Sequence, residues 1–344
     1  MQAIKNLLVC GAILFGTLTV SAQEELLKLG LEARVDYMRQ TIDGHHINDE
    51  SGFKGKFINL LISGDLGHGV SYAYRQRLNK AHKDQSFFDA TDYLYLSYTT
   101  PNDRWTLSAG KQVLGIGGYE YDMAPIDAYF YSEYCSQIAC YQLGASLTHT
   151  LKGGRDSFMA QVTESPFRAE KEMYAYNLMW VGKHGSFSAL YSLNAIEYLP
   201  GEYIYYVALG NRLEVGRVTL DLDIMNRATD RQPFFFNDCS VMGQVKVTAC
   251  DYLHLSAKAT YDVNRTHHAG DFCVPPGTEL TRLSAAVEVY PIRGKRNVRL
   301  HAAYSYTYGS DDAELNILRN KQSIIDFGLT WRMNLLSFTP NRRK

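Results

Sequence analysis

The 344-residue sequence lacks several features that would point to common protein classes. Beyond residue 22 it has no run of 18 or more apolar residues, so no transmembrane helix is expected. Its 35 Lys and Arg residues are balanced by 36 Asp and Glu residues, which leaves no basic footprint for a nucleic-acid partner. Its cysteines form no CxxC pair, so neither a zinc motif nor a redox motif is expected.

The first 22 residues have the composition of a secretory signal peptide. Lys5 supplies a positive region, Leu7 to Val20 an apolar stretch, and Val20-Ser21-Ala22 a small-residue cleavage signal. We therefore expect cleavage after Ala22 and an exported mature chain, residues 23–344, that forms one domain.

Apolar and polar residues alternate along most of this mature chain. Residues 27–37 alternate without a break, with Leu27 to Tyr37 apolar at odd positions, which is the period of a β-strand with one polar face. The second segment is ambiguous in phase, because Phe53 and Phe57 oppose Ile58. The pattern predicts sixteen strands, at 26–37, 53–64, 69–78, 88–99, 104–113, 137–150, 156–163, 173–182, 186–195, 203–213, 217–226, 240–248, 252–263, 280–289, 297–308 and 322–333.

The connections between these segments alternate between short and long. An antiparallel meander sends every second connection to the same end, and sorted loops are typical of outer-membrane barrels, with short periplasmic turns and long external loops. Tyrosines gather at the strand ends, as in membrane-interface belts. The sequence therefore predicts an all-β transmembrane barrel of about 16 strands in the bacterial outer membrane, surrounded by lipid. The alternative is a secreted β-sandwich or solenoid, which shows the same local alternation. The long connections lie at 38–52, 79–87, 114–136, 164–172, 227–239, 264–279 and 309–321, and only 196–202 is shorter.

The longest connection, residues 114–136, is the third on the external side. It contains the carboxylates Glu120, Asp122, Asp127 and Glu133. We expect it to fold into the bore and constrict it, with Gly117-Gly118 allowing the chain to reverse. Its carboxylates would then face basic residues of the early strands and create a transverse field that filters ions. The alternative is a solvated external loop. The basic residues expected to complete the constriction are Arg34, Arg75 and Arg77.

This region resembles the phosphate-selective porin O and P family. The similar residues are Gly110-Lys111-Gln112, the run from Gly117 to Asp122, Pro125-Ile126-Asp127 and the run from Tyr129 to Ser132. Asp92 to Tyr95 and Trp105 to Lys111 are similar too, whereas the rest of the chain matches only in pattern. The resemblance implies a sixteen-stranded diffusion channel that assembles as a homotrimer.

The wall departs from the run of arginines and lysines that the resemblance implies for phosphate-selective members. On the predicted register ten cations face inward, among them the pore-lining candidates Arg104, Lys258, Arg282 and Arg299. Seven carboxylates are interspersed with them, so the expected anion preference is mild. The other six cations are Arg34, Arg75, Arg77, Arg212, Lys246 and Arg332, and the seven carboxylates are Glu32, Asp36, Asp221, Asp223, Asp262, Glu288 and Asp326.

The sequence favours a passive porin for small hydrophilic solutes or ions, with no catalytic residue, metal or cofactor. The alternative is a barrel that acts as a surface receptor, adhesin or enzyme through its external loops, where His267-His268 and His45-His46 are candidate sites, although paired histidines in a loop are more often simply solvated. Cysteine pairing stays open. Cys239 with Cys273 or Cys135 with Cys140 are both feasible in an oxidising compartment, and Cys250 is expected to be free.

Overall fold

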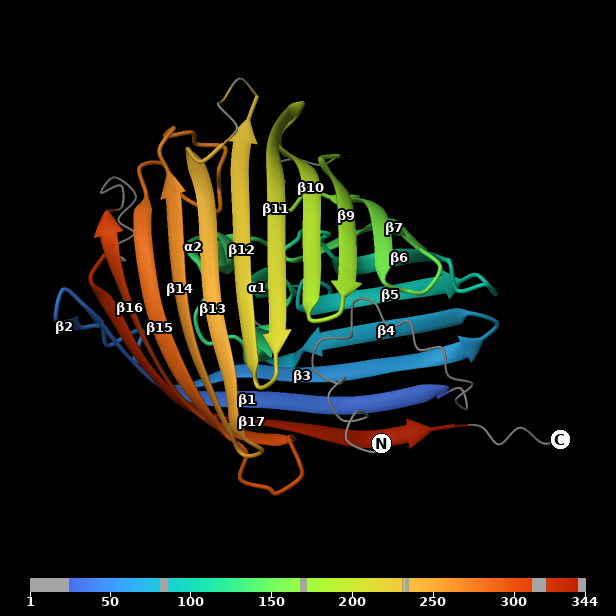
Figure 1. Ribbon diagram of the computed structural model, residues 1–344, viewed down its shortest axis with the longest axis horizontal. Helices are drawn as coiled ribbons and strands as arrows, with labels where there is room; N and C mark the ends of the chain where they lie inside the picture. The colour runs from blue at the N-terminus through green and yellow to red at the C-terminus, as the bar shows by residue number, and fades with distance from the viewer. Residues whose placement is uncertain are drawn as a thin grey trace.

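A computed structural model of the chain describes residues 25–80, 86–167, 172–230, 232, 235–310 and 320–339. The predicted signal peptide lies outside these residues. Sixteen long strands form a single antiparallel sheet that closes on itself (Figure 1), because β1 (Leu27–Ile42) pairs with β17 (Gln322–Phe338) along its whole length. A closed sheet leaves no backbone edge unpaired in lipid. No helix in the described part of the chain is both long and apolar enough to cross a membrane.

The observed strands correspond one to one with the sixteen predicted segments, and most extend further at the external end. A two-residue strand, β2 (His45–His46), adds a small hairpin to β1. The remaining strands are β3 (Gly52–Gly67), β4 (Val70–Arg77), β5 (Thr91–Thr99), β6 (Trp105–Val113), β7 (Tyr141–Thr150), β8 (Asp156–Glu164), β9 (Tyr174–His184), β10 (Phe187–Leu199), β11 (Glu202–Val215), β12 (Val218–Thr229), β13 (Asp238–Cys250), β14 (Leu253–Asn264), β15 (Glu279–Val289) and β16 (Val298–Ser310).

The two faces of the sheet have opposite chemistry. On β5, Leu94 and Leu96 are exposed on the outer face, whereas Tyr93 and Ser97 are buried on the inner face. The period of two carries this arrangement around the barrel, so that an apolar exterior surrounds a polar interior.

The phase ambiguity of the second segment has a structural cause. Arg34 of β1 pairs with Phe57 of β3, but Val35 pairs with Gly55, which leaves Lys56 as an extra residue. This β-bulge shifts the alternation by one position. Phe53 and Ile58 are therefore both exposed although their sequence positions have opposite parity.

The connection between β6 and β7 lies inside the barrel. It carries two short helices, α1 (Tyr119–Asp122) and α2 (Glu133–Gln137), which Figure 1 shows within the ring of strands. The largest apolar core lies where this connection meets the inner wall and the external loop between β14 and β15. Its buried members are Leu114, Ile116, Tyr121, Tyr134, Cys135, Ile138, Ala175, Ile196, Tyr198, Ile204, Tyr206, Ala208, Met225, Cys273 and Val274.

Neither of the two feasible cysteine pairings is formed. Cys135, Cys140, Cys239, Cys250 and Cys273 are all free thiols in the structure. Cys273 lies in the apolar core, where the Tyr206 hydroxyl donates to its Sγ atom over 3.8 Å. The external loop that carries Cys273 turns inward, so this thiol packs inside the barrel rather than against Cys239.

Candidate functional site: the loop across the lumen

Residues 114–140, here called the lumen loop, leave β6 and lie directly against the inner wall. Gly117 N donates to Ser192 Oγ over 2.8 Å, and Gly118 N donates to Leu190 O over 3.2 Å. A Cβ on Gly117 would lie 2.5 Å from Leu190 O, and Gly118 has a φ of 111°. The glycine pair is required because backbone meets backbone here, and because the chain turns through a conformation that favours glycine.

Glu120 ties the outgoing half of the lumen loop to its returning half. Its carboxylate accepts hydrogen bonds from Ser132 N (2.8 Å) and Ser132 Oγ (2.5 Å), and it pairs with Lys258 Nζ at 2.8 Å. Its own amide donates to Asp223 Oδ2 over 2.7 Å. Glu120 is only 5% exposed, so its charge is neutralised by Lys258 and holds the loop in shape rather than facing the passage.

Arg34 of β1 holds the tip of the lumen loop. Its guanidinium donates to Ala128 O over 2.5 Å and to Ile126 O over 3.4 Å. It also pairs with Asp36 at 2.8 Å and with Asp326 at 3.2 Å. Arg34 therefore contacts backbone carbonyls of the loop and not its carboxylates, which differs from the arrangement expected from the sequence.

A group with the spacing of a metal site surrounds Arg34. Asp36, His301 and Asp326 each offer a ligand atom, these atoms lie within 4.8 Å of one another, and all three residues are buried. The guanidinium of Arg34 lies within ion-pair distance of both carboxylates. It already supplies the positive charge that a metal ion would bring, so we assign no metal here.

Asp127 pairs with two arginines of the late strands. Its Oδ1 atom lies 2.8 Å from Arg299 Nη1 and 2.7 Å from Arg332 Nη2. Burial by itself would raise the pKa of Asp127, but Arg332 and Arg299 outweigh burial and hold that pKa below its usual range. Asp127 is therefore ionised and fixed against β16 and β17.

Asp122 differs from the other loop carboxylates. It is half-buried at the end of α1, and no hydrogen bond or ion pair to its carboxylate occurs within the described residues. Burial raises the pKa of Asp122 to about 6, although the nearby Arg212 opposes this rise. Asp122 is thus a loop charge that no fixed partner neutralises.

Glu133 begins α2 and is almost completely buried. Its amide donates to Asp262 Oδ2 over 2.8 Å, and its Oε1 atom accepts from Gln137 Nε2 over 3.1 Å. It contributes to the seating of α2 and does not face the arginines of the early strands.

Arg75 and Arg77 do not meet the loop carboxylates either. Arg75 pairs with Asp92 of the neighbouring strand β5 at 2.9 Å and donates to the Tyr141 hydroxyl. Arg77 lies 3.9 Å from the same carboxylate and stacks on Phe57. The predicted opposition of loop carboxylates to these two arginines is wrong, because a wall carboxylate already neutralises them.

The pore-lining candidates divide into two groups. Lys258 donates to Phe130 O, Arg282 donates to Tyr131 O, and Arg299 pairs with Asp127, so all three contact the lumen loop. Arg104 lies in the turn between β5 and β6, where its side chain is exposed and no contact with the loop is formed. Its placement in the lining set is therefore wrong, since β6 begins one residue after it.

A cavity of about 600 Å³ occupies the lumen beside the loop. Residues of the loop from Tyr119 to Phe130 form one side of it, and strands from β9 to β17 form the other. Cations outnumber carboxylates in its lining by seven to four. The cations are Lys183, Arg212, Lys246, Lys258, Arg296, Arg299 and Arg332, and the carboxylates are Asp122, Asp127, Glu214 and Glu288.

One buried residue near the lumen loop, Arg227, escaped the sequence analysis. Arg227 is fully buried at the external end of β12 and pairs with Asp271 at 2.6 Å. The sequence did contain a signal for Arg227, because it lies at an odd position of the same strand as Asp221 and Asp223, and the odd positions of this strand face the lumen. The predicted strand ended at residue 226, one position too early to include it.

Comparisons with known proteins agree with this geometry. A model of the phosphate-selective porin O and P family matches residues 27–196. No curated protein matches the sequence. An anion-selective porin from Comamonas acidovorans has a similar structure, with a TM-score of 0.65 and 9% identity, over 90% of this chain and 100% of that one.

Two further solved structures share the barrel. The outer-membrane channel DcaP of Acinetobacter baumannii has a TM-score of 0.61 and 11% identity, over 89% of this chain and 96% of that one. The trimer form of OmpT, an outer-membrane protein of Vibrio cholerae, has a TM-score of 0.60 and 10% identity, over 90% and 100%. At such identities the structures establish the fold, and the family match adds the porin character. The chain resembles the phosphate-selective porin O and P family over residues 27–196 and is an outer-membrane porin, a passive diffusion channel.

Proposed function

We propose that the lumen loop is the constriction of this porin and that the passage beside it mildly prefers small hydrophilic anions. The observation that carries this proposal is the lining of the 600 Å³ cavity, in which seven cations face four carboxylates. A lining that is rich in one sign of charge raises the local concentration of the opposite ion.

Several charges of the lining are paired with one another. Asp127 and Glu288 both pair with Arg299, at 2.8 Å and 3.2 Å, so their negative charge is offset locally. Lys183 and Arg296 line the same cavity, and neither has an ion-pair partner among the described residues. The field in the passage therefore comes mainly from these two cations and from Asp122 and Glu214, which also have no ion-pair partner among the described residues.

Conductance across a planar lipid bilayer tests the channel and its selectivity together. We expect stepwise, roughly ohmic openings, and in a KCl gradient a reversal potential whose sign reports chloride preference. A reversal potential of the cationic sign would contradict the anion preference. Silence in several salts would contradict conduction itself.

A cysteine placed in the loop tests whether the loop lines the passage. Ala124 lines the cavity, so Ala124→Cys should lose conductance when a small anionic thiol reagent is added. Lys152→Cys is the matched control, because Lys152 is exposed in the turn between β7 and β8. Equal block of both variants, or block of neither, would remove the loop from the conducting path.

We also propose the assembly and export of the chain. The OmpT structure from Vibrio cholerae that resembles this barrel is a trimer, and on that basis we propose a homotrimer. Cross-linking in native outer membranes checks the trimer.

We propose that residues 1–22 are cleaved after Ala22, which N-terminal sequencing of the purified protein checks. We assign the chain no catalytic role.

A further inference from the structure

The external loop between β14 and β15, residues 265–278, turns into the barrel instead of extending away from it. Cys273 and Val274 at its centre are completely buried. They pack in the same apolar core as Tyr134, Cys135 and Ile138 of the lumen loop. A loop on the external side therefore rests directly on the segment that we propose as the constriction.

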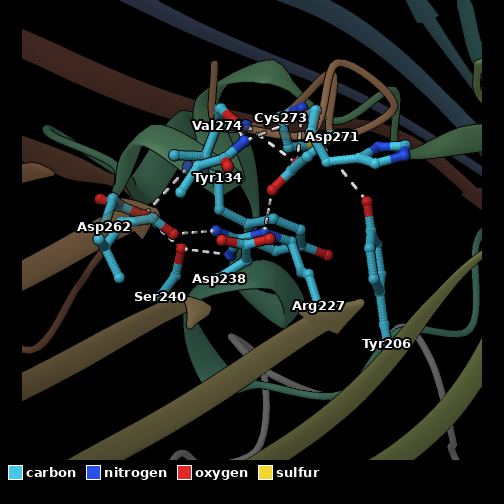
Figure 2. A network of polar contacts seen from close by, with 12 residues as sticks. Tyr134, Tyr206, Arg227, Asp238, Ser240, Asp262, Asp271, Cys273 and Val274 are labelled. Atoms are coloured by element: carbon cyan, nitrogen blue, oxygen red, sulfur yellow. Dashed lines mark hydrogen bonds and ion pairs between the residues drawn. The ribbon is translucent and has the colours of Figure 1, made fainter. Parts of the chain in front are cut away.

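Arg227 connects these two loops through a buried polar network (Figure 2). Its guanidinium donates to Asp271 Oδ2 (2.6 Å), to Ser240 Oγ (2.7 Å) and to Val263 O (3.0 Å). Arg227 is 1% exposed, and all of these partners lie in its immediate surroundings. A buried guanidinium is stable only while its charge is paired and its donors are occupied.

One branch of the network shapes the external loop. The second oxygen of Asp271 accepts from the amides of Cys273 (3.2 Å) and Val274 (3.1 Å). Where the loop begins, the carboxylate of Asp238 accepts from Thr266 N over 3.0 Å. The inward turn of the loop is thus held by the carboxylate of Asp271, which is itself paired with Arg227.

The other branch reaches α2 of the lumen loop. Ser240 Oγ donates to Asp262, and the carboxylate of Asp262 accepts from Glu133 N (2.8 Å) and Tyr134 N (3.3 Å). These two amides open the first turn of α2, which has no intrahelical partners for them. The guanidinium of Arg227 also lies 5.7 Å from the ring centre of Tyr134.

We propose that residues 265–278 form an external gate, and that Arg227 is the latch that holds this gate and α2 seated together against the wall. The inference rests on the proposed constriction by the lumen loop. Lifting the external loop would separate Asp271 from Arg227 and leave a buried charge unpaired. Because the same guanidinium supports α2 through Ser240 and Asp262, loss of the latch should release the gate and α2 together, which couples the opening of the channel to a loop on its external side.

The chain carries its own reporters for this coupling. Cys273 lies in the gate and Cys135 in α2, and both thiols are buried. Burial raises the pKa of the Cys135 thiol and of the Cys273 thiol, which suppresses their reaction with maleimides while the gate is seated. Labelling with a membrane-impermeant maleimide, followed by mass spectrometry, thus measures the exposure of Cys273 and of Cys135 separately.

Two variants break the latch, and one matched variant does not. Arg227→Met and Asp271→Asn should each raise the labelling rates of Cys135 and Cys273 together, by roughly tenfold or more. Arg265→Gln is the control, because Arg265 belongs to the same loop but pairs with Glu279 in an exposed ion pair at 3.4 Å. Asp271→Asn keeps the shape of the side chain, so it serves if Arg227→Met does not fold.

The outcomes separate the latch from the proposed constriction. Joint exposure of both thiols supports the latch, and faster open–closed fluctuations of the same variants in bilayers support its link to conduction. Exposure of Cys273 alone would mean that Arg227 holds only the external loop and not α2, which overturns the latch. Joint exposure with unchanged single-channel records would keep the latch and reject the constriction.

Discussion

Replacing Asp122 by Asn should change ion selectivity without changing the fold. Asp122 lines the lumen cavity and has no ion-pair partner within the described residues, so its removal breaks no fixed contact. The pKa of Asp122 is raised to about 6 by burial. Ionisation of Asp122 is therefore less favourable in the folded than in the unfolded chain, and Asp122→Asn should not lower the thermal stability.

The size of the effect follows from the dimensions of the cavity. A sphere of 600 Å³ has a radius of about 5 Å, and two unit charges at that distance in water interact with about 0.8 kcal/mol. A Debye length of about 8 Å at 0.15 M salt leaves roughly 0.4 kcal/mol, about a twofold change for each ion. The ratio of chloride to potassium permeability should rise about fourfold in 0.15 M salt, and less than twofold in 1 M salt, where the Debye length is about 3 Å.

Reversal potentials at pH 7.5 and pH 5 provide the assay. Because the pKa of Asp122 is about 6, the wild-type carboxylate is mainly charged at pH 7.5 and mainly protonated at pH 5. The wild type should become more chloride-selective as the pH falls, and at pH 5 it should match the selectivity of Asp122→Asn measured at the same pH. His254 also lines the cavity, but it is present in both proteins, so its contribution cancels in the comparison. Equal pH shifts in the two proteins would refute the reasoning.

Two further predictions concern the packing of the wall and the ion pair that holds the loop. Gly328→Ala should destabilise the barrel by about 1–3 kcal/mol, because its Cβ would lie 2.2 Å from a buried carboxylate oxygen, whereas Gly243→Ala meets nothing within 4 Å and should be tolerated. Denaturant unfolding of the two refolded variants measures the difference, and equal stabilities would contradict the packing argument. Lys258→Met should lower the free energy of unfolding by about 3–5 kcal/mol, because it leaves the buried Glu120 carboxylate without its cation. Adding Glu120→Gln should recover part of this loss, and strictly additive losses in a double-mutant cycle would show that the pair is not coupled.

The strands could be predicted from the sequence because each strand lies between lipid and a polar lumen, which imposes a two-residue alternation of apolar and polar side chains. Lipid outside and a polar lumen inside require side chains to alternate at every position, and the alternation stays readable in a single sequence. The pattern failed where the backbone inserts a residue. Lys56 at the β-bulge reverses the parity of β3, and no side-chain pattern distinguishes such a bulge from an ambiguous segment.

The inward course of the lumen loop could also be predicted from the sequence, but the wall residues that it contacts could not. The order of connections placed it third on the external side, and its length suggested that it enters the bore. Which wall residues it meets depends on the strand tilt and on the course of the loop through the barrel, which local patterns do not encode. Arg75 illustrates the outcome, since Asp92 on the adjacent strand neutralises it before the loop can.

The wall holds the loop mainly through the loop backbone. Arg34, Lys258 and Arg282 donate to loop carbonyls, whereas the wall carboxylates Asp223 and Asp262 accept from loop amides. Arg34 is also paired with Asp36 and Asp326, and Lys258 with Glu120, so these two charges add little to the field that a passing ion meets. The number of inward-facing charges in the sequence therefore says more about how the lumen loop is anchored than about which ions the channel prefers. Selectivity depends on the few lining charges without partners, which is why one carboxylate, Asp122, should have a measurable effect.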